Sequence, residues 1–205
     1  AGQSIDNGSV MTAARPEFTA ALEKGMTVAY WAQLQPNAPA VAAPTGNQTY
    51  AELNQRCNQV ARALRAHGVG VGDGIALLCA NRTEFVEVFW ATRRAGMRMT
   101  PINWRLTGEE AAYIANDCDA KVFIADARFQ AAAEHVAANA PRAQLRVAVG
   151  GAIPGFQSYE ALPGLSPQRL QPPAEAAKKA TATARKSSAK KSAAKKTAAP
   201  PEPVE

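Results

Sequence analysis

The amino-acid sequence predicts an α/β fold, in which a layered, mostly parallel sheet is flanked by helices. Short apolar runs typical of buried strands alternate with segments of ten or more residues that carry helical periodicity. Capping patterns mark where several of these helices begin. Hydrophobic residues make up 47% of the 205-residue chain, enough to bury a core. Strands that alternate with helices form βαβ units, so most strands are expected to pair in parallel.

The N-terminal part of the chain is expected to lead into the first long helix. Residues 1–17 carry little pattern and are predicted to be a flexible N-terminus. A short helix follows, and Pro36 ends it because proline cannot continue a helix. A strand at 40–43 and a turn at 44–46 come next.

A long amphipathic helix is predicted over residues 50–67. Its buried face is given by residues at spacings of three and four: Tyr50, Leu53, Cys57, Val60 and Leu64. Thr49 and Glu52 form a capping-box pattern at its start. Gly68 suits the left-handed residue just past its end.

The middle of the chain continues the alternation. The apolar run 75–80 is expected to be a buried strand. Asn81 and Glu84 are expected to cap the next helix, which ends at Gly96. An extended segment at 97–103 follows.

The same pattern recurs further along the chain. Thr107 and Glu110 form another capping box, which opens a helix that ends near "NDCD". Strands are expected at 121–125 and 145–149, with a helix over 128–140 between them. The closely spaced acidic residues of "NDCD" are interpreted as solvated turn residues where helix gives way to strand.

Four glycines in "HGVGVGDGIALL" raise the question of a phosphate-binding loop. A dinucleotide fingerprint needs a strand before its glycines and a helix after them. Here the helix comes first and the strand second, and the spacing is not G-x-G-x-x-G. The segment is therefore interpreted as a helix-to-strand corner, with Asp73 as a turn residue.

The C-terminal part of the chain differs in composition from the rest. Beyond Ile153 the regular pattern fades, with at most one helical turn around Tyr159. Residues 1–173 hold 15 basic and 14 acidic residues, a net charge of +1, whereas residues 174–205 hold 8 and 3, a net charge of +5. Residues 166–205, Pro-rich and then Lys/Ala-rich, are predicted to be a disordered tail because they contain almost no large apolar residues.

The tail resembles the lysine-rich tails of linker histones, which favours sequence-nonspecific nucleic-acid binding as an alternative function. A solubilising or accidentally translated extension is the competing interpretation. The candidate nucleic-acid contacts are the tail's basic residues: Lys178, Lys179, Arg185, Lys186, Lys190, Lys191, Lys195 and Lys196.

Cysteine and histidine usage gives no sign of a metal site. The three cysteines form no CxxC pair, and His67 and His135 have no partner at ligand spacing. Unpaired cysteines in apolar patterns suit a reducing compartment. With no apolar run of membrane-spanning length, a cytoplasmic location is expected.

Several segments together resemble the N-terminal portion of acyl-CoA synthetases, in the adenylate-forming, AMP-binding superfamily. They are "TYAEL" with its helix, "GVGVGDGIALL", "PINWRLTGEE" and "DAKVFIAD", in family order over residues 36–126. A looser match continues to "GFQSYEALPG". The resemblance implies that residues 18–165 are a partial N-terminal domain of this adenylate-forming fold.

The resemblance also implies a chemistry. Full-length family members use ATP, Mg²⁺ and CoA to join a fatty or other carboxylic acid to AMP and then to CoA. Their phosphate loop ends in Pro-Lys-Gly, a Thr-Glu pair helps to hold Mg²⁺, and a C-terminal lysine completes the site. None of these motifs is present here, so we expect no catalytic, cofactor-binding or metal residue and no bound cofactor in this chain.

The chain is accordingly expected to be a truncated acyl-CoA synthetase, inactive alone. Phe85, Phe89 and Trp90 are a candidate acyl-pocket wall, although an aromatic cluster of this kind is more often core. A third alternative is a non-catalytic partner that docks on a complete synthetase, or an oligomer, through an uncovered apolar face.

Overall fold

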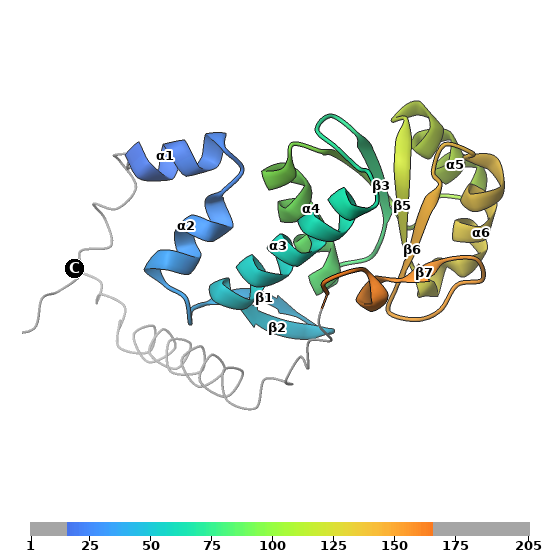
Figure 1. The fold of residues 1–205 in the computed structure, drawn as a ribbon. Helices are drawn as coiled ribbons and strands as arrows, with labels where there is room; N and C mark the ends of the chain where they lie inside the picture. Colours follow the sequence, from blue (N-terminus) through green and yellow to red (C-terminus); the bar gives the residue numbers. More distant parts are fainter. Residues whose placement is uncertain (1–15, 166–205) are drawn as a thin grey trace, which may run out of the picture. The chain divides into compact units, whose positions relative to one another are not determined.

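A computed structural model describes residues 16–165 of the chain. The N-terminal elements are helices α1 (Pro16–Glu23) and α2 (Thr27–Leu34), followed by an antiparallel hairpin of β1 (Pro39–Ala43) and β2 (Gly46–Thr49). The hairpin leads directly into α3 (Tyr50–Ala66), which the remaining elements follow (Figure 1).

The main body is a doubly wound sheet with helices between its strands. Its elements are β3 (Gly74–Leu78), α4 (Thr83–Ala95), β4 (Arg98–Ile102), α5 (Gly108–Asp117), β5 (Ala120–Asp126), the 3₁₀ turn η1 (Ala127–Phe129), α6 (Gln130–Asn139), β6 (Leu145–Val149), β7 (Gln157–Ser158) and the 3₁₀ turn η2 (Tyr159–Ala161). The strand order is β4-β3-β5-β6-β7, and every neighbouring pair is parallel. The chain winds outward from β3 in both directions, so the order reverses between β3 and β5.

The two faces of the sheet bury separate apolar clusters. Figure 1 shows α3 and α4 on one side of the sheet and α5 and α6 on the other. Alternate strand residues face each layer because side chains alternate along a strand. Toward α3 and α4 the sheet presents Ile75, Leu77, Val122, Ile124, Val147 and Val149. Toward α5 and α6 it presents Ala76, Leu78, Phe123, Ala125 and Ala148.

The structure confirms the predicted fold class and most helix ends. Both capping boxes form: the Thr49 and Thr107 hydroxyls accept the backbone N–H groups of Glu52 and Glu110, and each carboxylate accepts from its threonine's N–H in return. Gly68 takes a left-handed φ of +76° just past the end of α3. The four-glycine segment connects α3 to β3, and the Asp73 carboxylate accepts from Gly70 N–H at 2.8 Å, as expected of a turn residue.

Three local features differ from the sequence-based expectations. Strand β2 was not expected because Gly-Asn-Gln-Thr is polar, and its extended form depends on pairing with β1. Helix α1, which has no buried residue, was also not expected. The expected cap of α4 by Asn81 and Glu84 is wrong: the hydroxyl of Thr45, in the β1–β2 turn, accepts the Thr83 N–H at 3.3 Å.

A buried ionic cluster ties the chain after β7 to the α3–α4 layer. Arg56 of α3 and Glu87 of α4 are 3% and 2% exposed, and the guanidinium Nε donates to both carboxylate oxygens at 3.2 Å. Tyr159 of η2 donates to the same carboxylate at 2.9 Å, and Gln48 of β2 donates to it at 2.5 Å. Arg56 also donates to Glu160 at 2.7 Å. Five side chains from four elements therefore depend on one another.

Candidate functional site

The carboxyl ends of β3 and β5 meet where the strand order reverses. Ligands of open α/β sheets bind in the crevice outside this edge, because the connections on its two sides leave toward opposite faces. Here β3 is followed by the segment 79–82, β5 ends at Asp126, and β6 is followed by two glycines. A ligand site is therefore expected among the groups at these strand ends.

Asp126 is the buried charge of this edge. Its carboxylate accepts from the backbone N–H of Arg128 at 3.1 Å and from that guanidinium at 2.6 Å. Arg82 Nε lies 4.0 Å away on the other side. Burial alone would raise the pKa of Asp126, but the hydrogen bonds from Arg128 and the two positive charges outweigh it and lower the pKa.

Arg82 spans the ends of three strands. It follows β3, lies beside Asp126 of β5, and pairs with Glu84 at 2.8 Å. Burial by itself would lower its pKa, but the hydrogen bond and charge of Glu84 raise it. A Cβ at Gly150, after β6, would lie 2.7 Å from the guanidinium nitrogens. Gly150 also has a φ of +73°, a backbone conformation that favours glycine. The absence of a side chain at this position leaves room for the Arg82 guanidinium.

Two stacked aromatic rings lie next to this charge cluster. The rings of Trp104, which follows β4, and Phe129, in η1, are 5.5 Å apart and inclined by 14°. The Arg105 guanidinium lies 5.0 Å from the Trp104 ring centre, and that of Arg128 lies 5.7 Å from the Phe129 ring centre. Trp104 is 43% exposed. We call these four residues the Trp104 platform.

The Trp104 platform suits a planar, phosphorylated ligand. Guanidinium groups match phosphate oxygens in a forked geometry, and exposed aromatic rings stack on bases. The Arg128 guanidinium already donates to Asp126 through two nitrogens, whereas among the described residues the Arg105 guanidinium has only the ring contact. Trp104 and Arg105 are therefore the groups most available to a ligand.

The described residues do not fit a bound Mg²⁺. In residues 16–165 no group of three His, Cys, Asp or Glu side chains is placed to hold a metal ion. At the carboxyl edge, the Asp126 carboxylate already accepts hydrogen bonds from arginine.

Burial raises the pKa of Cys57 and of Cys79 to about 12, so neither thiol is a ready nucleophile at neutral pH.

The predicted acyl-pocket residues lie on α4, which precedes the Trp104 platform in the sequence. Phe85 and Trp90 are half-buried and pack against the α3–α4 cluster. Phe89 meets Trp90 edge-to-face at 5.0 Å, with the Arg93 guanidinium over its ring. The packing of Phe85 and Trp90 agrees with the core interpretation; an acyl-pocket role for the three residues stays a prediction.

Two other predictions from the sequence stay untested. The tail residues Lys178, Lys179, Arg185, Lys186, Lys190, Lys191, Lys195 and Lys196 lie outside the described range. Docking through an apolar face also stays a prediction, although Leu22, Met26 and Leu34 of the α1–α2 region are exposed. Within residues 16–165, no helix combines the length and apolar character that crossing a bilayer requires.

Sequence reasoning missed the Trp104 platform and Asp126. A signal was present, because "WR" follows the extended segment predicted at 97–103 and "DARF" follows the strand predicted at 121–125. In a parallel sheet, residues directly after neighbouring strands gather at one edge. Strand order was needed to see that these two segments come together, and the pattern alone did not give it.

The comparison with protein families is decisive for identity. A family model described as "AMP-binding enzyme" matches residues 28–198, most of the chain. The chain belongs to the AMP-binding enzyme family. The match is longer than the 36–126 stretch on which the sequence resemblance rests, and it extends past the described residues.

Individual AMP-binding enzymes show the same relationship. The chain is 27% identical over 156 residues to a fatty acid–[acyl-carrier-protein] ligase, ScoC, of Streptomyces coeruleorubidus, and 33% identical over 130 residues to a long-chain-fatty-acid–CoA ligase of Thermus thermophilus. These alignments cover 76% and 63% of the chain but only 30% and 24% of the relatives. The chain therefore spans less than a third of their length.

Solved structures of AMP-binding enzymes share the fold. The anthranilate CoA ligase AuaEII, in complex with anthranoyl-AMP, superposes with a TM-score of 0.64 at 28% identity, over 67% of this chain and 27% of that one. The N-terminal domain of FACL13 from Mycobacterium tuberculosis gives a TM-score of 0.58 at 28% identity, over 61% of this chain and 33% of that one.

Replacing Asp126 with asparagine should destabilise this AMP-binding enzyme chain by about 2 kcal/mol at neutral pH, because a buried charge-assisted hydrogen bond is lost. A lowered pKa contributes stability that is present above the unfolded pKa of about 3.9 and is lost as pH falls through the folded pKa. The wild type and Asp126→Asn should therefore converge below about pH 4 in urea titrations at several pH values. An equal difference at all pH values would contradict this role.

Proposed function

We propose that this AMP-binding enzyme chain forms part of a ligase that joins a carboxylic acid to the thiol of CoA at the expense of ATP. In this proposal residues 16–165 supply the framework, and the Trp104 platform contacts the phosphorylated nucleotide of CoA. The observation that carries the proposal is the exposed Trp104–Phe129 stack with its two guanidinium groups, next to the point where the strand order reverses.

The chemistry of CoA matches these groups. Its adenine ring is planar and stacks on an exposed aromatic ring, while its phosphates pair with guanidinium groups. The printed names of related proteins, a long-chain-fatty-acid–CoA ligase and an anthranilate CoA ligase, support the choice of an acid and CoA as substrates. A fatty acid is the acid we propose, because two of the relatives named above act on fatty acids.

We further propose that residues 1–205 alone do not adenylate the acid. The 205-residue sequence contains no Ser/Thr/Gly-rich loop ending in Pro-Lys-Gly, which the family uses for the phosphates of ATP. A cytoplasmic location fits this role, because all three cysteines are free and a reducing compartment keeps them so.

Incubating the purified chain with ATP, Mg²⁺, a fatty acid and CoA should yield no AMP above a protein-free control. A full-length fatty acid–CoA ligase in the same buffer serves as the positive control. Formation of AMP and acyl-CoA in equal amounts would show that the chain carries its own adenylation site, and would overturn this part of the proposal.

CoA binding tests the Trp104 platform directly. Trp104→Ala should weaken CoA binding about tenfold or more in isothermal titration, because base–aromatic stacking contributes about 1–3 kcal/mol. Arg105→Gln should weaken binding about tenfold through the loss of a charge-assisted contact. Arg62→Gln, an exposed arginine on α3, is the matched control and should bind as the wild type does. Equal affinity in all four proteins would refute this assignment.

A further inference from the structure

A polar cavity lies at the opposite, amino-terminal edge of the sheet. Its volume is about 390 Å³, and it is lined by the end of α3, the first residues of β5 and the segment that leads into β6. Basic or amide side chains form one part of its wall: His67, Lys121, Arg142 and Gln144. Val69 and Leu145 form an apolar part. We call it the amino-edge pocket.

Two of the basic groups each pair with one aspartate and have donors to spare. The Lys121 ammonium pairs with Asp73 at 2.7 Å, and Asp73 is itself fixed by the Gly70 N–H at 2.8 Å. Arg142 pairs with Asp119 at 2.7 Å through one guanidinium nitrogen. An ammonium has three N–H donors and a guanidinium has five, so each retains donors for a further acceptor. The aspartates orient these cations and leave donors for an anion.

His67 adds a group of complementary kind. Its Nδ1 lies 2.9 Å from the carbonyl oxygen of Ala63, and because a carbonyl only accepts, Nδ1 carries the hydrogen. In the neutral ring Nε2 is then an acceptor. A phosphate monoester is partly protonated near its second pKa of about 6, and this P–OH can donate to Nε2 while the other oxygens accept from Lys121 and Arg142. Sulfate has no such proton.

We propose that the amino-edge pocket binds an organic phosphate monoester. Its oxyanion contacts Lys121, Arg142 and His67, and its organic part lies against Val69 and Leu145. Val69 is buried and Leu145 is half-buried, and both line the apolar part of the pocket. An organic group can pack against them, whereas a bare inorganic ion cannot. The pocket lies at the edge of the sheet opposite the Trp104 platform, so this site is independent of the proposed CoA contact.

The two histidines of the chain allow a site-specific test in the intact protein. Imidazole resonances of His67 and His135 are followed by NMR while phenyl phosphate, inorganic phosphate or sulfate is added at constant ionic strength. The resonances are assigned with His135→Gln. His67 should shift saturably with phenyl phosphate, less readily with inorganic phosphate and least with sulfate, whereas His135, on α6, should not respond.

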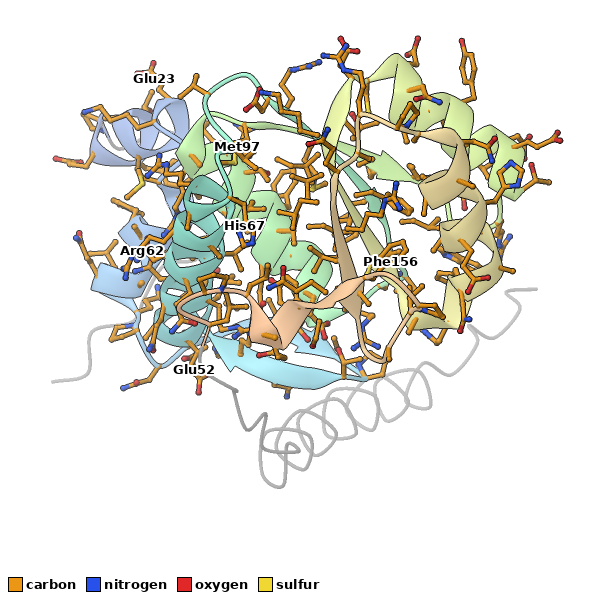
Figure 2. The ribbon with its side chains drawn as sticks, turned by 45° about the vertical axis from the view of Figure 1, so that its right-hand side comes forward. Glu23, Glu52, Arg62, His67, Met97 and Phe156 are labelled. Atoms are coloured by element: carbon orange, nitrogen blue, oxygen red, sulfur yellow. The ribbon has the colours of Figure 1, made fainter. Side chains whose placement is uncertain are left out.

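Variants complete the test. Lys121→Gln and Arg142→Gln should each weaken phenyl phosphate binding about tenfold, because each removes a charge-assisted contact. Arg62 lies on the other side of α3 from His67 in Figure 2. The control variant Arg62→Gln should therefore leave phenyl phosphate binding unchanged. Equal shifts at both histidines, equal affinity for phenyl phosphate and sulfate, or equal weakening in Arg62→Gln would each overturn the proposal.

Discussion

Replacing Glu87 with alanine is expected to lower the free energy of unfolding by about 3–5 kcal/mol, because it leaves a buried guanidinium without its main counter-charge. Burial alone would lower the pKa of Arg56, but the nearby Glu87 carboxylate raises it, so Arg56 is charged in the folded protein. After the substitution Glu160 still pairs with Arg56, but Glu160 is 46% exposed, so its charge is more strongly screened by solvent and salt.

The loss also reaches the segment after β7. Tyr159 is 2% exposed, and burial raises its pKa well above the usual value, so its hydroxyl is protonated and needs an acceptor. Glu87 is that acceptor at 2.9 Å. Glu87→Ala is therefore expected to loosen residues 157–162 as well as the α3–α4 contact. Hydrogen exchange in this segment should speed up in the variant.

Two further variants serve as controls for the unfolding measurement on Glu87→Ala. Glu109→Ala, at an exposed position in the first turn of α5, should lower the unfolding free energy by less than about 1 kcal/mol, the size of a carboxylate's interaction with a helix N-terminus. The double variant Arg56→Met/Glu87→Leu should be more stable than Glu87→Ala, because it leaves no buried guanidinium without its main counter-charge. A loss below about 1 kcal/mol in Glu87→Ala in urea unfolding would show that the cluster does not hold these elements together.

Gly74→Ala is the second substitution expected to have a large effect, with a loss of about 3 kcal/mol. A Cβ at Gly74 would lie 2.6 Å from the Cys118 carbonyl oxygen and 3.0 Å from that of Asp119. Both obstacles are backbone atoms, so neither relaxes by a simple side-chain rotation. The pairing of β3 with β5 is irregular at this point, since Gly74 pairs with Ala120 and Ile75 with Val122.

Gly70→Ala is the matched control for this substitution. Gly70 lies in the same corner, and its nearest neighbour to a new Cβ is Asp73 Oδ2 at 3.8 Å, an ordinary contact. The unfolding free energy of the Gly70→Ala protein should stay within about 0.5 kcal/mol of that of the wild type. If both glycine variants lose stability equally, a general intolerance of the corner to side chains explains the effect, and the close approach of β3 to the Cys118–Asp119 backbone does not.

Local sequence signals were sufficient to predict the start of a helix where both capping residues lie within a few residues of each other. Thr49 with Glu52 and Thr107 with Glu110 satisfy donors within a few residues, so the pattern names both partners. The buried strand runs were equally clear, because both faces of a parallel sheet are covered and the central residues, 75–78 of β3 and 122–125 of β5, are all apolar.

Features that depend on long-range pairing were not predictable from the sequence. Strand β2 exists only against β1, and α4 is capped by Thr45, 38 residues earlier in the chain. The ionic cluster joins Arg56 to Glu160, 104 residues apart. The Trp104 platform likewise needs the strand order, which periodicity does not encode.

Hydrogen–deuterium exchange of the full chain with and without CoA tests the central claim most directly, because it locates binding along the sequence. The account predicts slower exchange in the segments 103–106 and 126–130 when CoA is present. Slower exchange elsewhere with no change in these two segments would contradict the assignment of the carboxyl edge as the binding surface.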